Sequence, residues 1–281
     1  MKQFMGLDGI SVKQLAKQLN SRLKSCNIDK IQQPGRYDLL ITFRAGGSPK
    51  LLLSCDPARP AAYIAAKRRS NPLQAPMFCM FLRKHLGGAK LLSAETPAYE
   101  RLIRFRFSKR DEIGDEKIRS LIIEMMGRHS NIILTDEHDI IMDAMIHVDE
   151  SISRYREVLP ARPYLPPPPQ DKPMPAARLN KMQTQTPEEF LEGFTSQKLE
   201  RALLDLCLGL SPVLSREILW RCEIDPGRKK ESLRTEEIRQ LYKVSMLFLE
   251  EIINLEGGAG FYYPEAKRGR GDCHAMELDS L

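Results

Sequence analysis

The sequence lacks the cysteine spacing of a zinc site or of a disulfide-stapled domain. Its six cysteines are scattered, and no two of them form a CxxC pair. This usage favours a reducing cytoplasm. No apolar stretch follows a basic start at the N-terminus, and no uncharged apolar run is long enough to span a bilayer. We therefore expect a cytoplasmic protein without a secretory signal and without a membrane partner.

The motifs of common enzyme classes are also missing. There is no phosphate-binding P-loop, no GxGxxG after a strand, no HExxH and no GxSxG. His129 stands in no recognisable catalytic constellation, with no obvious nucleophile beside it. Asp111, Asp115 and Glu116 are dense enough to bind Mg²⁺, but nothing fixes a coordination geometry, so a solvated turn explains them better. The sequence predicts no enzyme, no catalytic residue, no cofactor and no metal site.

What the chain does have is enough length and apolar content for two ordinary domains. It holds 281 residues, of which 42% are hydrophobic and 28% charged, a composition typical of globular proteins. Lys and Arg number 43 against 37 Asp and Glu, giving a net charge of +6. This mildly basic balance is a weak indication of a polyanionic partner.

A predicted β-hairpin organises the first half. Two apolar runs, Ile118–Met126 and Ile132–Leu134, flank a polar linker that contains Gly127 and Asn131, which predicts an antiparallel pair. The first run is apolar on both alternating faces, as is typical of a central strand covered on both sides. Arg128 and His129 in the turn must then face water or a ligand.

Other elements of the first half follow from periodicity. Strands are predicted at 28–33, 37–44, 50–55, 61–66, 100–107 and 139–146, and helices at 11–24 and 76–86. On the strand at 100–107, Ile103, Phe105 and Phe107 alternate with partly cationic positions.

Four consecutive prolines, Pro166 to Pro169, divide the chain, because such a run forms a stiff polyproline II segment. The helical second half includes a capping box at Thr186 and a helix–GLSP–helix unit with Ser211 as a cap. This unit looks like a helix-hairpin-helix, whose turn can aim backbone N–H groups at a phosphate, although an ordinary helical hairpin has the same pattern. The predicted divisions are a β-rich domain at 1–163, a linker at 164–178, an all-α domain at 179–260 and a tail at 261–281.

Two short features have more than one explanation. Glu100 and Arg101 at a strand entry form either a surface ion pair of little energetic value or a recognition pair, with Arg donating to a phosphate or a base edge. The residues alone favour the surface pair. The tripeptide Arg270-Gly271-Asp272 matches the sequence that integrins bind, and we ascribe it to coincidence.

Several longer strings resemble the NFACT family: PMFCMFLRKHL from Pro76, the run Glu112–Glu116, MGRHSNIILTD from Met126 and YREVLPARPY from Tyr155. Bacterial members of this family are called RqcH or fibronectin-binding protein A, and NEMF is a eukaryotic relative. The resemblance runs in order along essentially the whole chain. It implies an α+β fold with an NFACT-N domain followed by a helix-hairpin-helix domain. Family members continue into a coiled coil and an RNA-binding domain, so we expect an N-terminal part.

The resemblance implies a role in ribosome-associated quality control. Family members bind the large ribosomal subunit that carries a stalled peptidyl-tRNA, and they recruit tRNA (alanyl-tRNA in bacteria) to extend the nascent chain without mRNA. NFACT-N is similar to the N-terminal domain of formamidopyrimidine-DNA glycosylases, which attack with an N-terminal proline. This chain begins Met1-Lys2-Gln3, so glycosylase activity is not implied.

The resemblance also changes which residues we expect to be functional. The family's tRNA-recruiting Asp-Arg pair falls on Glu100 and Arg101, where the acid is one methylene longer. We therefore expect these two residues to bind tRNA. Arg128, His129 and Asn131 are either RNA contacts or a turn-stabilising set.

Two other functions remain open at this point. An adhesin that binds fibronectin is suggested by the older family name, although the absent signal and scattered cysteines oppose it. A DNA-processing enzyme is suggested by the glycosylase-like architecture, and the missing N-terminal proline opposes it.

Overall fold

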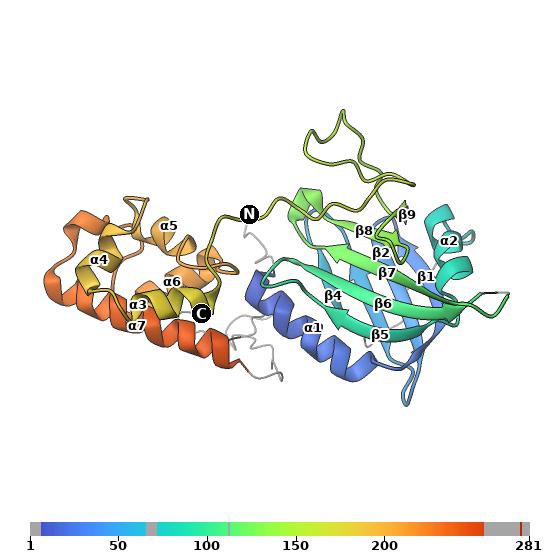
Figure 1. The fold of residues 1–281 in the computed structure, drawn as a ribbon, viewed down its shortest axis with the longest axis horizontal. Coiled ribbons are helices and arrows are strands. Elements are labelled where there is room, and N and C mark those ends of the chain that lie inside the picture. The colour runs from blue at the N-terminus through green and yellow to red at the C-terminus, as the bar shows by residue number, and fades with distance from the viewer. Residues whose placement is uncertain (1–6, 66–71, 112, 256–275, 277–281) are drawn as a thin grey trace. The chain divides into compact units, whose positions relative to one another are not determined.

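The computed structural model describes residues 7–65, 72–111, 113–255 and 276. These form two compact units (Figure 1). Among the described residues, the β-rich unit comprises residue 7, residues 15–97 and residues 101–169, while the helical unit comprises 8–14, 98–100 and the chain from 170 onward. The predicted α+β class is confirmed. The predicted tail at 261–281, with its Arg-Gly-Asp tripeptide, lies outside the described residues except for Met276.

A nine-stranded sheet forms the β-rich unit, with the order β4-β3-β2-β1-β5-β6-β7-β8-β9 and antiparallel pairing throughout. The two groups β1–β4 and β5–β9 join where Asn27 of β1 pairs with Lys90 of β5. The strands are β1 (Asn27–Gly35), β2 (Asp38–Arg44), β3 (Lys50–Ser54), β4 (Ala61–Ile64), β5 (Lys90–Glu95), β6 (Leu102–Arg110), β7 (Glu116–Glu124), β8 (Asn131–Thr135) and β9 (Ile141–Ala144).

The predicted central hairpin is confirmed as β7 and β8. Leu121 pairs with Leu134 and Ile123 with Ile132, and β7 lies between β6 and β8. The last part of β7, from Ser120 onward, is buried, as its apolar residues on both faces predicted. Sequence periodicity missed β5, because its Lys-Leu-Leu-Ser-Ala-Glu run contains no β-branched or aromatic residue.

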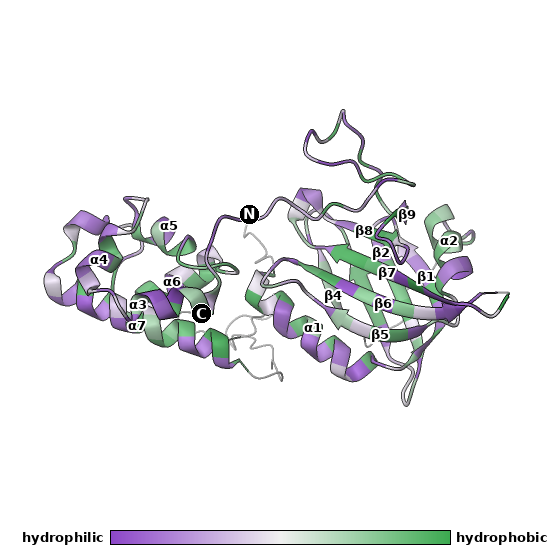
Figure 2. Ribbon diagram, in the orientation of Figure 1, coloured by the Kyte–Doolittle hydropathy of each residue, from purple (hydrophilic) through white to green (hydrophobic). Residues whose placement is uncertain are grey.

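Two helices accompany the strands, α1 (Gly9–Leu23) and α2 (Met77–Leu86). Figure 2 shows hydrophobic and hydrophilic segments alternating along α1, as an amphipathic helix requires. The helix α2 packs on β1 and buries Phe78, Cys79, Leu82 and Leu86. Its other apolar residues include Met77, which is 86% exposed.

The helical unit contains α3 (Pro175–Met182), α4 (Pro187–Glu192), α5 (Leu199–Leu204), α6 (Pro212–Arg221) and α7 (Thr235–Asn254). The predicted capping box at Thr186 is confirmed, since its hydroxyl accepts from Glu189 N–H and the Glu189 carboxylate accepts from Thr186 N–H. The helix α3 was not predicted, because it begins at a proline inside the expected linker; proline is favoured at a first helical position.

The turn between α5 and α6 is hydrogen-bonded to the carboxylate of Asp8, which precedes α1. Ser211 caps α6 by accepting from Leu214 N–H, and its hydroxyl donates to Oδ2 of Asp8 at 2.8 Å. The other oxygen, Oδ1, accepts from Ser11 N–H at 2.8 Å and so caps α1. Asp8 is 5% exposed. The side chain at the start of α6 thus has a carboxylate partner within the helical unit.

Gly209 of this turn has no room for a side chain. Its φ is +95°, and an added Cβ would lie 2.8 Å from Tyr99 Cβ. The fit is close because Tyr99 and Ile10 belong to the apolar core of the helical unit. Glycine satisfies both demands, the positive φ and the close approach.

We expect Gly209→Ala to lower the free energy of unfolding substantially, because overpacking and left-handed backbone each cost about 1–3 kcal/mol. Urea unfolding followed by the fluorescence of Trp220, the single tryptophan, measures it. Gly193→Ala, in the same helical unit as Trp220, is the control, since its φ is −65° and the nearest atom to an added Cβ would lie at 3.4 Å. Equal transition midpoints for the two variants would contradict this account of the turn.

Candidate functional site

Arg101 lies at one end of the sheet. It immediately precedes β6, and its carbonyl accepts from Met125 N–H at 2.8 Å, which extends the β6–β7 ladder by one position. Its side chain is exposed and has neither an ion pair nor a hydrogen bond with any residue that the structure describes. The guanidinium is therefore available to a ligand. Glu100 belongs to the helical unit and is half-buried.

The turn after β7 presents two further candidates. Gly127–His129 form a short 3-10 helix, in which Gly127 has a φ of +57°. Both Arg128 and His129 are exposed, and Arg128 Nε donates to His129 Nε2 at 3.0 Å. Ser130 closes the turn by accepting from Met126 N–H. The expectation that Arg128 and His129 face water or a ligand agrees with this exposure.

Asn131 differs from its two neighbours because it is 3% exposed. Its amide nitrogen donates to Ile146 O at 2.7 Å, and its oxygen accepts from the N–H groups of Ile132 and Ile146. Every one of these contacts is with backbone. Of the two alternatives that the sequence left for Asn131, this geometry favours the turn-stabilising role.

Strand register brings these candidates to the same end of the sheet. Glu124, the last residue of β7, pairs with Leu102 of β6 on one side and with Asn131 of β8 on the other. Arg101 and the 3-10 turn therefore adjoin the same strand end. Their spatial proximity could not be derived from sequence distance alone, because it depends on the β6–β7 register.

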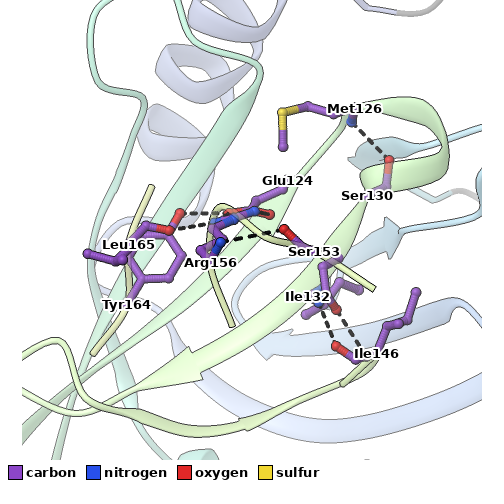
Figure 3. Close-up of polar contacts among 10 residues, drawn as sticks. Glu124, Met126, Ser130, Ile132, Ile146, Ser153, Arg156, Tyr164 and Leu165 are labelled. Carbon is purple, nitrogen blue, oxygen red and sulfur yellow. Dashed lines mark hydrogen bonds and ion pairs between the residues drawn. The ribbon is translucent and has the colours of Figure 1, made fainter. Parts of the chain in front are cut away.

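Beneath this end lies a buried charge that sequence reasoning missed. Glu124 is 0% exposed, and Arg156 approaches it with both terminal nitrogens (Figure 3). Tyr164 Oη donates to the same carboxylate at 2.8 Å, and Arg156 also donates to Leu165 O. The available sequence signal was a lone acid at the end of an apolar run.

Electrostatics determine the protonation states within this cluster. Burial lowers the pKa of Arg156, but the hydrogen bond and charge of Glu124 outweigh that effect and raise it. Burial together with the Glu124 charge raises the pKa of Tyr164. Arg156 therefore stays a cation and Tyr164 stays a hydrogen-bond donor at neutral pH.

The carboxylates of the acidic turn before β7 accept hydrogen bonds from the turn itself and from the adjoining strand. Asp111 Oδ1 accepts from the N–H groups of Ile113 and Asp115, and Glu116 accepts from the Ser108 hydroxyl. Among the residues that the structure describes, no group of three His, Cys, Asp or Glu could hold a metal ion. No described helix has the length and apolarity to cross a bilayer.

The sequence matches the family described as NFACT N-terminal and middle domains over residues 8–280. This chain belongs to the NFACT family. A curated relative named Rqc2 homolog RqcH, from Bacillus subtilis (strain 168), is 35% identical over 282 residues, which cover 99% of this chain and 47% of the relative. The chain thus spans about half the length of that relative.

A solved structure shares this fold, and a further curated relative matches part of the chain. The N-terminal part of the fibronectin/fibrinogen-binding protein from Streptococcus suis is 26% identical with a TM-score of 0.72, covering 97% of this chain and 91% of that one. A formamidopyrimidine-DNA glycosylase of Desulfitobacterium hafniense (strain DSM 10664 / DCB-2) is 36% identical over 99 residues, 31% of this chain and 36% of the glycosylase. The expected glycosylase likeness therefore extends over part of the chain.

We expect Arg156→Leu to lower the free energy of unfolding by about 3–5 kcal/mol, because it leaves the Glu124 carboxylate buried without its cation. Urea unfolding measures the loss. The double variant Glu124→Met/Arg156→Leu should lose less than Arg156→Leu, since no unpaired charge then remains.

Arg162→Leu is the matched control, because its ion pair with Glu157 has an arginine side chain that is 58% exposed. A pair of that kind contributes about 0–1 kcal/mol. If Arg156→Leu and Arg162→Leu unfold at the same urea concentration, the Glu124 cluster does not hold this end of the sheet.

Proposed function

We propose that this protein acts in ribosome-associated quality control, where it binds tRNA and the large ribosomal subunit that carries a stalled peptidyl-tRNA. In this role it supports mRNA-independent, C-terminal alanine tailing of the stalled chain. Two facts support the role: membership of the NFACT family and the similarity to a relative named Rqc2 homolog RqcH. The protein positions RNA and catalyses no step itself, and peptide-bond formation belongs to the ribosome.

One observation carries the assignment of the tRNA contact. Arg101, at the position of the family's Asp-Arg pair, exposes a guanidinium with no described partner at the end of a rigid sheet. Arginine suits this task because its planar donors match phosphate oxygens and guanine edges bidentately. Glu100 supplies an acceptor for a base amine in the same proposal, with one methylene more than aspartate.

Arg128 and His129 extend this proposed surface. They are exposed on the turn that adjoins the strand end next to Arg101, so an RNA strand held by Arg101 passes within their reach. Asn131 contributes indirectly, because its backbone hydrogen bonds hold the end of that turn.

A second candidate function is binding of fibronectin at a cell surface. The Streptococcus suis protein whose structure resembles this chain is described as fibronectin/fibrinogen-binding. A basic chain adheres to many acidic ligands, so this function requires binding that persists at physiological salt.

We expect Arg101→Ala to weaken tRNA binding by about 1–3 kcal/mol, the usual cost of losing a bidentate arginine contact. Fluorescence anisotropy with labelled tRNA, beside a duplex DNA of similar charge and across a salt series, measures the loss. Arg154→Ala is the control, because Arg154 is also exposed and has no side-chain partner among the described residues.

The same variant should stop alanine tailing on stalled large subunits while thermal unfolding stays unchanged. Normal tailing by Arg101→Ala, or equal losses for Arg101→Ala and Arg154→Ala, would refute the assigned contact. Salt-resistant capture of the chain by immobilised fibronectin, unaltered in Arg101→Ala, would favour the adhesin instead.

A further inference from the structure

A group of cations gathers at the C-terminal end of α2, away from Arg101. Figure 2 shows hydrophilic segments at the end of the β6–β7 hairpin. The last turn of α2 is basic, and register places Lys109 opposite Lys117 and Phe107 opposite Arg119 on one face of β6 and β7. We name this group the α2 basic cluster; its members are Arg83, Lys84, His85, Lys109, Lys117 and Arg119.

Backbone carbonyls draw part of this cluster together. Lys109 Nζ donates to Lys84 O at 2.9 Å, and Arg119 donates to His85 O at 3.0 Å. Both acceptors lie in the last turn of α2, whose carbonyls have no partner within the helix. Arg83 Nε likewise donates to Ile31 O at 2.9 Å. The carbonyls thus fix the cations in place but leave their positive charge unneutralised.

The acidic turn that joins β6 and β7 lies close in sequence to Lys109 and Lys117, but no described carboxylate forms an ion pair with the cluster. None of the cluster's lysines or arginines has an ion pair among the described residues. Glu116 pairs across the strands with Arg110 and contacts Ser108, so it lies on the opposite face from Lys117. The helix end supplies only about half a negative charge. The five lysines and arginines compare with a net charge of +6 for the whole chain.

The cations affect one another's protonation. Burial lowers the pKa of His85, and the neighbouring Arg119, Lys84 and Lys109 lower it further. Burial also lowers the pKa of Lys109, with Arg119 adding to the effect. Like charges at this distance repel, and a ligand carrying several negative charges would relieve that repulsion.

We propose that the α2 basic cluster is a second RNA-binding surface that holds backbone phosphates without reading sequence. Lysine ammonium groups suit phosphates as compact point charges, and the cluster offers exposed Lys84 together with half-buried Lys109 and Lys117. The choice of RNA rests on the proposed function, which already supplies an RNA partner.

The strand β6 sets the distance between the two surfaces. Arg101 precedes this strand and Lys109 lies near its far end, so eight residues at ~3.3 Å each separate them by about 26 Å. One arginine side chain cannot cover that distance. The cluster therefore contacts phosphates different from those near Arg101, either on the same tRNA or on ribosomal RNA.

The test removes two charges without removing a contact. The amines of Lys84 and Lys117 have no partner among the described residues, so Lys84→Gln/Lys117→Gln should fold normally. The control Lys24→Gln/Lys243→Gln removes the same net charge from two exposed lysines elsewhere in the chain. Thermal unfolding confirms that both variants of the 281-residue chain are folded.

Each variant is titrated across a salt series in two arms, with labelled deacylated tRNA by anisotropy and with purified large ribosomal subunits by cosedimentation. We expect the cluster variant to reduce the slope of log affinity against log salt by about 1 for each lysine. The arm in which the slope falls identifies the RNA. The control should leave both slopes unchanged.

The proposal is overturned if the cluster variant changes neither slope, or if the control changes them equally, since the latter would reflect net charge alone. Arg101→Ala is measured in parallel. A loss in Arg101→Ala without a loss in the cluster variant rejects the second surface and keeps the proposed function. The reverse result rejects the Arg101 contact and keeps the cluster.

Discussion

The burial of Glu124 is the constraint on which the presenting end of the sheet depends. A carboxylate with no access to water must find a cation and a hydrogen-bond donor, and Arg156 and Tyr164 supply them from a segment more than thirty residues later. Meeting that requirement draws the segment after β9 onto the end of β7. The neighbours of this strand end in the ladder are the start of β6 and the start of β8. The buried Glu124 carboxylate thus holds in place the strand end beside which the exposed Arg101 and Arg128 lie.

Sequence patterns predicted those elements and caps that depend on residues close together in the sequence. The hairpin β7–β8, the helix α2 and the Thr186 cap follow from periodicity and cap residues, and each is present. What the patterns missed depends on contacts between distant residues. The residues around Glu124 do not predict its pairing with Arg156, and those around Asn131 do not predict its hydrogen bond to Ile146 O. Exposure separates Arg128 and His129 from Asn131, although the three are almost consecutive.

The two ends of β6 and β7 differ in how they hold positive charge. At one end the Arg101 guanidinium, which has no partner among the described residues, lies beside a small turn, a geometry suited to a directed contact. At the other end Lys109 and Arg119 are anchored by carbonyls of α2 beside further cations, a geometry suited to a diffuse field. Between them the β6–β7 ladder pairs every residue from Leu102 to Arg110 without a bulge. Such a regular ladder resists bending, so it keeps a constant separation between Arg101 at one end and the α2 basic cluster at the other.

The link between Asp8 and Ser211 has a consequence for how nucleic acid can compete for this chain. A polyanion that approached the Ser211 hydroxyl would compete with a carboxylate of the same molecule, which already accepts from that hydroxyl and from the Ser11 N–H. An intramolecular rival of this kind acts at a high effective concentration that does not change with dilution. The Ser211 hydroxyl and the Ser11 N–H therefore meet the Asp8 carboxylate at the same effective concentration, however dilute the protein is.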